Sequence, residues 1–114
     1  MSDFPDRSSL PLTPAVFHIL LSLLEGPKHG YAIMKDVAEH TDGELRLGPG
    51  KLYYSIQRLL DEALIEEVEG DDTPAGKKRR PYRVTAAGVR IARAEALRLK
   101  RSLRLAEARR LFGD

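Results

Sequence analysis

The sequence predicts a mainly α-helical fold with one small β-hairpin and a long C-terminal helix. Apolar residues recur at helical spacing in three short segments between residues 13 and 63. Two short runs of strand-forming residues follow, separated by turn formers, and the remainder is rich in Ala, Leu and Arg. With 114 residues, the chain is long enough for one domain, and small enough that a partner subunit would add usefully to its core.

The charge is distributed unevenly along the chain. Residues 1–72 hold 6 Lys/Arg and 14 Asp/Glu, a balance of −8, whereas residues 73–114 hold 13 and 3, a balance of +10. The basic charge therefore gathers in the hairpin and the last helix, although a basic helix alone is more often a solvated face than a ligand site. The chain has no cysteine, so neither disulfides nor thiolate metal sites are expected.

No segment resembles a membrane span or a secretory signal. The longest apolar run, residues 19–24, is interrupted by Ser22 and is far shorter than the ~20 residues that cross a bilayer. Nothing near the start combines basic residues, an apolar run and a small-residue cleavage site. We therefore expect a cytoplasmic protein that does not enter a membrane.

The first helix is expected to begin at Thr13-Pro14 and to run to about Glu25. Threonine is a good N-cap and proline fits the first helical position, while Gly26-Pro27 ends the helix. Apolar residues, Phe17 among them, cover most of its circumference. This predicts burial on two sides, against the core and against a second subunit.

Two further short helices follow. The second is expected after His29-Gly30, ending at Thr41-Asp42-Gly43, and the third begins at Gly48-Pro49-Gly50. Their spacing predicts inward faces made of Tyr31, Ile33, Met34 and Val37 in the second helix and of Leu52, Ile56, Leu59, Leu60 and Ala63 in the third.

A β-hairpin is predicted next, with strands at residues 65–69 and 80–84 and turn formers at residues 70–76. Pro81 has no N–H for the ladder, so the second strand should be an edge at that point. The Gly-flanked tip carries Lys77, Lys78, Arg79 and Arg80. Three helices and a basic-tipped hairpin are typical of a winged helix-turn-helix, which puts its third helix in the DNA major groove and its wing on phosphates or a narrow minor groove.

The outward face of the third helix is the candidate surface for reading DNA. It carries Lys51, Tyr54, Gln57 and Arg58. Arg with guanine and Gln with adenine are the pairings that major-groove geometry favours, each worth about 1–3 kcal/mol of discrimination. Asp61 and Glu62 at the end of the helix would repel phosphates, so its first turns are expected to do the reading.

After Thr85 a helix is expected to about Leu111, roughly 40 Å long at ~1.5 Å per residue. So small a domain cannot cover it. An apolar stripe at 3-4 spacing predicts packing against a second copy; its residues are Val89, Ala92, Ala96, Leu99, Leu103 and Ala106. In a twofold dimer the third helices would meet successive major grooves about 34 Å apart, which predicts a palindromic operator.

Several stretches resemble the PadR family of bacterial transcription regulators, in its short form with one C-terminal helix. They are Leu12-Thr13-Pro14, Gly26-Pro27-Lys28-His29-Gly30-Tyr31 with Ile33, Gly48-Pro49-Gly50-Lys51-Leu52-Tyr53 with Leu59-Leu60, Leu64-Ile65, and Tyr82-Arg83-Val84-Thr85-Ala86-Ala87-Gly88. The chain departs from the family at Lys51, usually Thr or Ser, and at Ala63, usually Gly; alanine disfavours a left-handed turn there.

The resemblance implies a homodimer made by the C-terminal helix, repression of a nearby operon and release by a small effector. It also implies that Tyr53 lies at the boundary with DNA. A helical wheel puts Tyr53 at the margin of the apolar face, so we expect its ring to pack while its hydroxyl reaches a phosphate. One branch of the family stacks planar drugs between Trp residues. This chain has no Trp, so that mode of sensing is not expected.

Catalytic and metal-dependent functions have little support in the sequence. The three histidines, His18, His29 and His40, lack the i, i+4 spacing of a helical metal pair. Adjacent acidic residues in the hairpin point to different sides of a strand. We therefore expect no catalytic residue, no metal and no cofactor. A winged-helix module that binds a protein instead of DNA is the alternative.

The sequence thus predicts a sequence-specific DNA-binding transcriptional regulator. It would be a homodimeric repressor of a palindromic operator, released by a small effector that the sequence does not identify. The expected organisation is a flexible N-terminal segment at residues 1–12, a winged helix-turn-helix domain at 13–85 and a dimerisation helix at 86–114.

Overall fold

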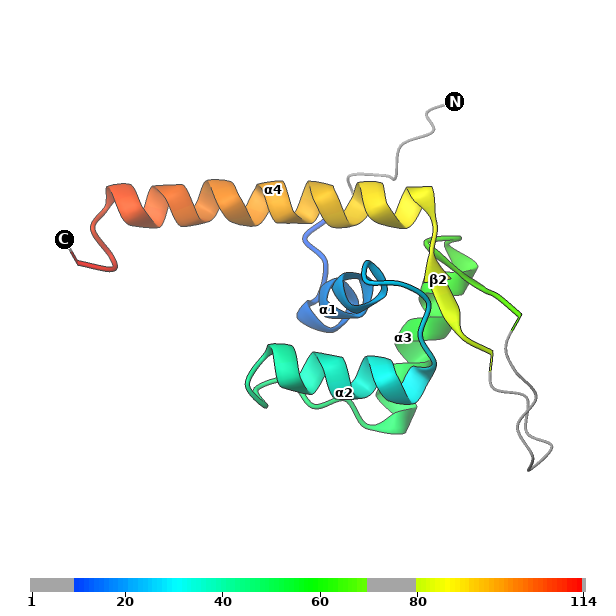
Figure 1. Cartoon of the computed structure of the whole chain (residues 1–114). Coiled ribbons are helices and arrows are strands. Elements are labelled where there is room, and N and C mark those ends of the chain that lie inside the picture. The colour runs from blue at the N-terminus through cyan, green and yellow to red at the C-terminus, as the bar shows by residue number, and fades with distance from the viewer. Residues whose placement is uncertain (1–9, 70–79, 114) are drawn as a thin grey trace.

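Four helices and one β-hairpin make up the described part of the chain (Figure 1). The computed structural model describes residues 10–69 and 80–113. In chain order the elements are α1 (Pro14–Leu23), α2 (Gly30–His40), α3 (Pro49–Asp61), β1 (Ile65–Glu67), β2 (Tyr82–Val84) and α4 (Ala86–Ala108). The predicted fold class is confirmed.

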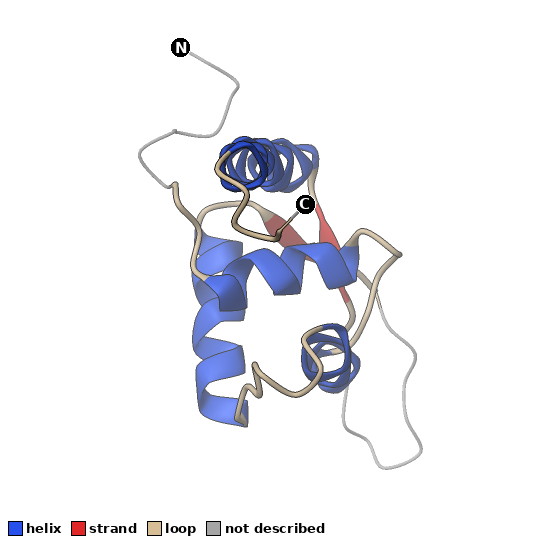
Figure 2. Cartoon of the chain, turned by 90° about the vertical axis from the view of Figure 1, so that its left-hand side faces the viewer, coloured by secondary structure: helices blue, strands red, loops and turns tan. Residues whose placement is uncertain are grey.

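Helix α1 lies at the centre, between α4 on one side and α2 on the other (Figure 1). Figure 2 looks along α4 and α2 and shows α1 lying across the space between them. Ile19, Leu20 and Leu23 of α1 are buried in one cluster with residues of the other elements and of the loops between them, namely Ile33, Val37, Leu47, Leu52, Ile56, Leu59, Leu64, Ile65, Ile91 and Ala92. Burying one such large side chain contributes about 1.5–3 kcal/mol, so this cluster fixes how α3 and α4 sit on α1.

One polar network ties α1 to α2 and to the hairpin. The fully buried Ser22 donates through Oγ to the Asp36 carboxylate at 2.7 Å. The Lys28 ammonium donates to the same carboxylate and to Glu25 at 2.6 Å. Burial opposes the ionised form of Asp36, but the hydrogen bonds from Lys28 and Ser22 hold its pKa below its ordinary value. The backbone of Lys28 also exchanges two hydrogen bonds with Tyr82, at 3.1 and 2.9 Å.

Both predicted threonine caps form. The Thr13 hydroxyl accepts the Val16 N–H at 3.2 Å, and the Thr85 hydroxyl accepts the Gly88 N–H at 3.1 Å. Each satisfies one of the N–H groups that a helix start leaves unpaired. The starts of α1 and α4 are therefore set by residues next to them in the sequence.

Helix α3 ends at Asp61, and Ala63 in the turn after it adopts a left-handed conformation with φ +57°. The Leu64 N–H donates to the Leu59 carbonyl at 2.9 Å and the Ala63 N–H to the Leu60 carbonyl at 3.0 Å, which is the Schellman pairing. The prediction that Ala63 belongs to the inward face is wrong, because the turn leaves it exposed. The alanine accepts a conformation that glycine adopts more readily, because the buried Leu59 and Leu64 flank the turn.

Strands β1 and β2 pair antiparallel, with Ile65 opposite Val84. They are shorter than the predicted strands, although the Val68 N–H still donates to the Pro81 carbonyl at 2.9 Å. The outer edge of β2 is not free next to Pro81. Tyr82 forms a bridge there with the loop between α1 and α2.

Among the described residues, the other elements pack against the first half of α4 alone. Its buried residues are Gly88, Ile91, Ala92 and Glu95. At Gly88 the helix passes so close to the hairpin that a Cβ would collide with the Leu64 carbonyl oxygen. Residues 96–108 are almost all exposed, and this half projects beyond α1 and α2 (Figure 1). Among the described helices, none has the length and apolar character needed to cross a membrane.

Candidate nucleic-acid interface

The outward side of α3 presents four of the residues predicted to read DNA. Lys51, Tyr54, Gln57 and Arg58 are all exposed, and the Arg58 side chain keeps 62% of its surface accessible. On the opposite side, Leu52, Ile56 and Leu59 are each no more than 2% exposed. Because rotating the helix would uncover these residues, the outward face is held at a fixed angle to the domain.

Two acidic side chains lie against the end of this face. The Gln57 amide donates to the Asp61 carboxylate at 2.9 Å, and an Arg58 nitrogen lies 3.9 Å from a Glu62 oxygen. All four side chains are exposed. An exposed ion pair contributes only about 0–1 kcal/mol, so the Arg58 guanidinium can exchange Glu62 for another anionic partner.

Tyr53 lies on α3 and is 51% exposed. Its hydroxyl oxygen would be 2.7 Å from a Cβ built on Gly30, the first residue of α2. Burial raises the pKa of Tyr82 of β2, and the charges of Tyr53 and Glu67 raise it further. Tyr53 therefore lies where the start of α3 meets the start of α2.

Of the four predicted wing residues, Arg80 alone falls within the described part of the chain. Lys77, Lys78 and Arg79 lie outside the described residues. The Arg80 side chain is 54% exposed, and one of its guanidinium nitrogens lies 3.9 Å from a Glu67 oxygen. Such a long, exposed contact leaves the guanidinium able to take another partner.

The sequence reasoning missed two exposed residues on α2. Tyr31 is 63% exposed, and the Lys35 ammonium lies 5.8 Å from the centroid of its ring. The prediction that Tyr31 faces inward is wrong, whereas Ile33 and Val37 are fully buried as predicted. A helical wheel would have shown this, because Tyr31 lies roughly 160° from Ile33 at 3.6 residues per turn, on the opposite side of the helix. Tyr31 and Lys35 therefore form an exposed aromatic and cationic pair on α2.

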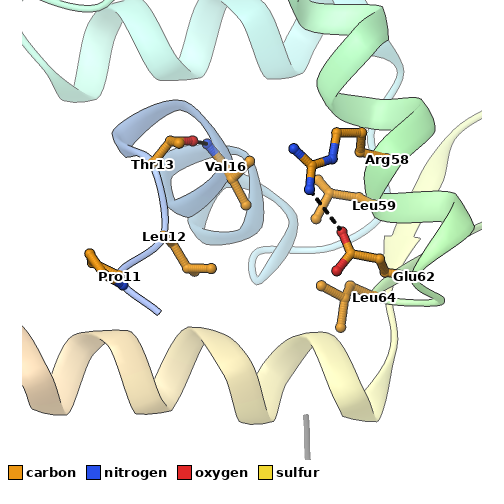
Figure 3. Close-up of a pocket in the computed structure, with 8 residues that line it drawn as sticks. All are labelled: Pro11, Leu12, Thr13, Val16, Arg58, Leu59, Glu62 and Leu64. Carbon is orange, nitrogen blue, oxygen red and sulfur yellow. Dashed lines mark hydrogen bonds and ion pairs between the residues drawn. The ribbon is translucent and has the colours of Figure 1, made fainter. Parts of the chain in front are cut away.

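A cavity of about 300 Å³ lies between the start of α1 and the end of α3 (Figure 3). It is lined by Pro11, Leu12, Thr13, Val16, Arg58, Leu59, Glu62 and Leu64. Apolar side chains form most of its walls. Arg58 and Glu62, at the end of α3, line one side, and the dashed line between them in Figure 3 marks their ion pair. The cavity therefore shares one residue with the candidate reading face.

The acidic side chains near α2 already have a cationic partner. Glu25, Asp36 and His40 bring potential metal-ligand atoms within 4.8 Å of one another. The Lys28 ammonium contacts both carboxylates. Burial lowers the pKa of Lys28, but these carboxylates outweigh it and raise the pKa above its ordinary value. The cluster is thus accounted for as a network that joins α1 to α2.

The predicted dimerisation stripe falls into two parts. Ala92 is 3% exposed and packs into the chain's own core, which leaves it no surface for a partner. Val89 and Phe17 are half-buried, and the Phe17 ring lies edge-on to His18. The first part of the stripe therefore serves mainly the fold of its own chain.

The second part of the stripe is open. Leu99 and Leu103 are 40% and 50% exposed, Ala96 is exposed and Ala106 is half-buried. Leu97, Leu105, Leu111 and Phe112 are exposed as well but lie off this stripe. A helix half whose apolar stripe has no cover from the described chain is typical of a subunit interface.

Three packed helices, an exposed third helix and a hairpin next to it define a winged helix-turn-helix protein. The family described as "Transcriptional regulator PadR-like family" matches residues 19–94. The chain belongs to this family.

Solved structures share the fold over most of the chain. A transcriptional regulator from Clostridium thermocellum has a TM-score of 0.70 at 22% identity, covering 91% of this chain and 96% of that one. A PadR family transcription regulator from Clostridium difficile has a TM-score of 0.73 at 21% identity, covering 84% and 97%. RosR from H. salinarum, in its structure as the complex RosR-S4, has a TM-score of 0.64 at 26% identity, covering 82% and 75%.

Two relatives were found by sequence. Protein X from Lysinibacillus sphaericus is 34% identical over 70 residues, which cover 61% of this chain and 63% of that protein. A 37.1 kDa protein of transposon TN4556 from Streptomyces fradiae is 37% identical over 78 residues, 68% of this chain and 21% of that protein. The chain therefore spans less than two thirds of either relative.

Proposed function

We propose that the protein is a homodimeric repressor that binds a palindromic operator through α3 and the basic tip of its hairpin. The observation that carries this proposal is the outward face of α3, where polar side chains stand on a helix anchored by three buried residues. Arg58 and Gln57 supply the donors that pair with guanine and adenine. Lys51, Tyr53 and Tyr54 lie on the same helix, and Lys77, Lys78, Arg79 and Arg80 would contact phosphates.

Dimerisation is supported by the uncovered half of α4. Leu99 and Leu103 keep about half of their surface exposed, on a helix that extends past the domain. Packing this half against a second copy would bury the stripe and relate the two α3 helices by a twofold axis. Half-sites one helical turn apart, about 34 Å, would then form a palindrome. Repression is what the resemblance to the PadR family implies, and the family model itself describes transcriptional regulators.

Release by a small effector is supported by the cavity between α1 and α3. Its volume of about 300 Å³ is at the lower end of the usual range for small-molecule sites, and its walls are mostly apolar. Because Arg58 lines it, a compound bound there would compete with DNA for the guanidinium. By linkage, DNA would weaken binding of the effector by the same factor.

Fluorescence anisotropy with a duplex from upstream of the gene, and with a shuffled duplex of equal composition, tests DNA reading. Arg58→Ala should lower affinity for the upstream duplex by about ten- to a hundredfold. The ratio of affinity for the upstream duplex to affinity for the shuffled duplex should therefore fall. Lys77→Ala should weaken binding to both duplexes. It should also reduce by about one the slope of the logarithm of affinity against the logarithm of salt concentration.

The matched control is Arg104→Ala, which removes an exposed arginine from the projecting half of α4. It should retain both affinities. If the double variant Arg58→Ala, Lys77→Ala binds both duplexes as the wild type does, the face and the tip do not read DNA. A winged-helix module that recognises an acidic protein would then take the place of this proposal.

A further inference from the structure

The first residue of α2, Gly30, leaves no space for a side chain. A Cβ built on Gly30 would lie 2.7 Å from the Tyr53 hydroxyl oxygen, 3.1 Å from its Cζ and 3.3 Å from a ring carbon. Carbon atoms in good contact are about 3.5–4.0 Å apart. The phenol of Tyr53 therefore lies directly over the α-carbon of Gly30.

Backbone conformation does not explain a glycine at this position. The glycines with positive φ among the described residues are Gly26, Gly43 and Gly113, and Gly30 is not one of them. Gly30 is a regular residue of the first turn of α2, where alanine is normally the better helix former. The remaining reason for a glycine at residue 30 is the space that Tyr53 occupies.

This contact places Tyr53 of α3 against the start of α2. Tyr53 nevertheless stays 51% exposed. A tyrosine has only two rotatable side-chain bonds, so packing of its hydroxyl end on Gly30 restricts where its exposed edge lies.

We propose that Gly30 is a positioning residue for the contact between Tyr53 and DNA. By lacking a side chain, Gly30 allows the phenol to lie against α2, and this fixes where the hydroxyl is offered to a backbone phosphate. A hydrogen bond from a hydroxyl to a phosphate depends on short distance and good alignment. The inference rests on the proposed function, since the role of Tyr53 in binding DNA is itself part of that proposal.

A methyl group at residue 30 would displace the far end of a half-exposed side chain, so the fold should persist while the hydroxyl moves. A double-mutant cycle of Gly30→Ala and Tyr53→Phe, measured by anisotropy with the upstream duplex, tests this. Each single variant should weaken DNA binding about tenfold, the effect of losing one charge-assisted hydrogen bond. Gly30→Ala should change affinity less than about twofold when Phe is already present, because the colliding oxygen and the phosphate contact are both gone.

Urea unfolding of the same four proteins without DNA shows whether the fold is kept. Gly50→Ala is the matched control, because Gly50 also lies in the first turn of a helix and an added Cβ meets nothing within 4 Å. It should unfold at the same or a higher urea concentration than the wild type. Gly30→Ala should unfold more readily than Gly50→Ala, and Tyr53→Phe should reduce that difference.

The outcomes separate this inference from the proposed function. The role of Gly30 would be overturned if Gly30→Ala bound the upstream duplex as tightly as wild type. It would also be overturned if Gly30→Ala lowered DNA affinity equally with Tyr and with Phe at residue 53. A third contradicting result would be that Gly30→Ala does not fold and that adding Tyr53→Phe does not restore folding. If wild type does not distinguish the upstream duplex from the shuffled one, the proposed function fails. If it does, and Tyr53→Phe binds as tightly as wild type, only the role of Tyr53 and Gly30 fails.

Discussion

Arg98 forms a two-point ion pair with the buried carboxylate of Glu95, one turn earlier on α4. The Nε–Oε1 and Nη2–Oε2 distances are 2.7 and 2.9 Å, and Glu95 is 2% exposed. The hydrogen bonds from Arg98 lower the pKa of Glu95 below its ordinary value; burial opposes this, and the Leu12 backbone N–H adds to it. The carboxylate thus joins α4 to the segment that precedes α1.

Glu95→Gln is expected to reduce the sensitivity of the fold to acid. The folded pKa is depressed, so ionised Glu95 contributes stability that is present above its ordinary value of 4.5 and is lost as pH falls through the lower folded value. The free energy of unfolding of the wild type should therefore fall more steeply below about pH 5 than that of the variant. Urea unfolding at a series of pH values measures both slopes.

Asp36 also has a lowered pKa. The stability of Glu95→Gln should therefore still fall in acid, but less steeply than that of the wild type. The matched control is Glu107→Gln, on an exposed part of the same helix, which should keep the wild-type slope. Identical slopes for wild type and Glu95→Gln would show that Glu95 does not carry this pH dependence.

Ala63→Gly is expected to stabilise the protein. Ala63 holds a left-handed conformation at φ +57°, which is unfavourable by roughly 1–2 kcal/mol for a residue with a Cβ, while the greater freedom of glycine in the unfolded chain offsets part of the gain. The free energy of unfolding should rise by about 1 kcal/mol. Ala108→Gly, at an exposed helical position, should lower it. If urea unfolding finds Ala63→Gly no more stable than wild type, the left-handed conformation of Ala63 does not strain the turn.

The parts of the fold that depend on neighbouring residues could be predicted from the sequence. Thr13 and Thr85 cap the helices that they precede, and the spacing of Leu52, Ile56 and Leu59 identified the buried side of α3. The outward face, which carries the proposed function, followed from that spacing. Local chemistry and periodicity were enough because a single buried side decides the orientation of a short helix.

The parts that depend on distant residues could not be predicted. Tyr53 meets Gly30, and Lys28 meets Tyr82, across turns whose geometry the sequence does not specify. Within α4, the 3-4 spacing suggested one continuous stripe and overlooked the buried Glu95. The helix in fact packs on its own core over one half, and nothing in residues 10–69 and 80–113 covers the other half. Where that change occurs depends on the packing of α4 against the rest of the fold.

Leu99→Glu combined with Leu103→Glu is expected to convert a dimer into a monomer. Both leucines lie on the uncovered stripe of α4, and a charge buried in an interface without a partner is strongly unfavourable. Light scattering should report the mass of one chain, and DNA affinity should fall because a monomer reaches only one half-site. Leu97→Glu is the matched control, since Leu97 is 52% exposed and lies roughly 160° from Leu99 around the helix. A dimer in both proteins, or a monomer in both, would contradict the assignment of the stripe.

Glu62→Gln is expected to tighten DNA binding. The Glu62 carboxylate lies 3.9 Å from Arg58 at the end of the outward face, where it restrains the guanidinium and repels phosphates. Removing its charge should raise affinity a few-fold at low salt, with the gain shrinking as salt screens both effects over a Debye length of ~10 Å at 0.1 M. Anisotropy titrations at two salt concentrations measure this. Glu39→Gln removes an exposed charge from the last turn of α2 and should have a smaller effect. If both variants gain equally, net charge alone sets the affinity, and the contact between Glu62 and Arg58 has no specific part in it.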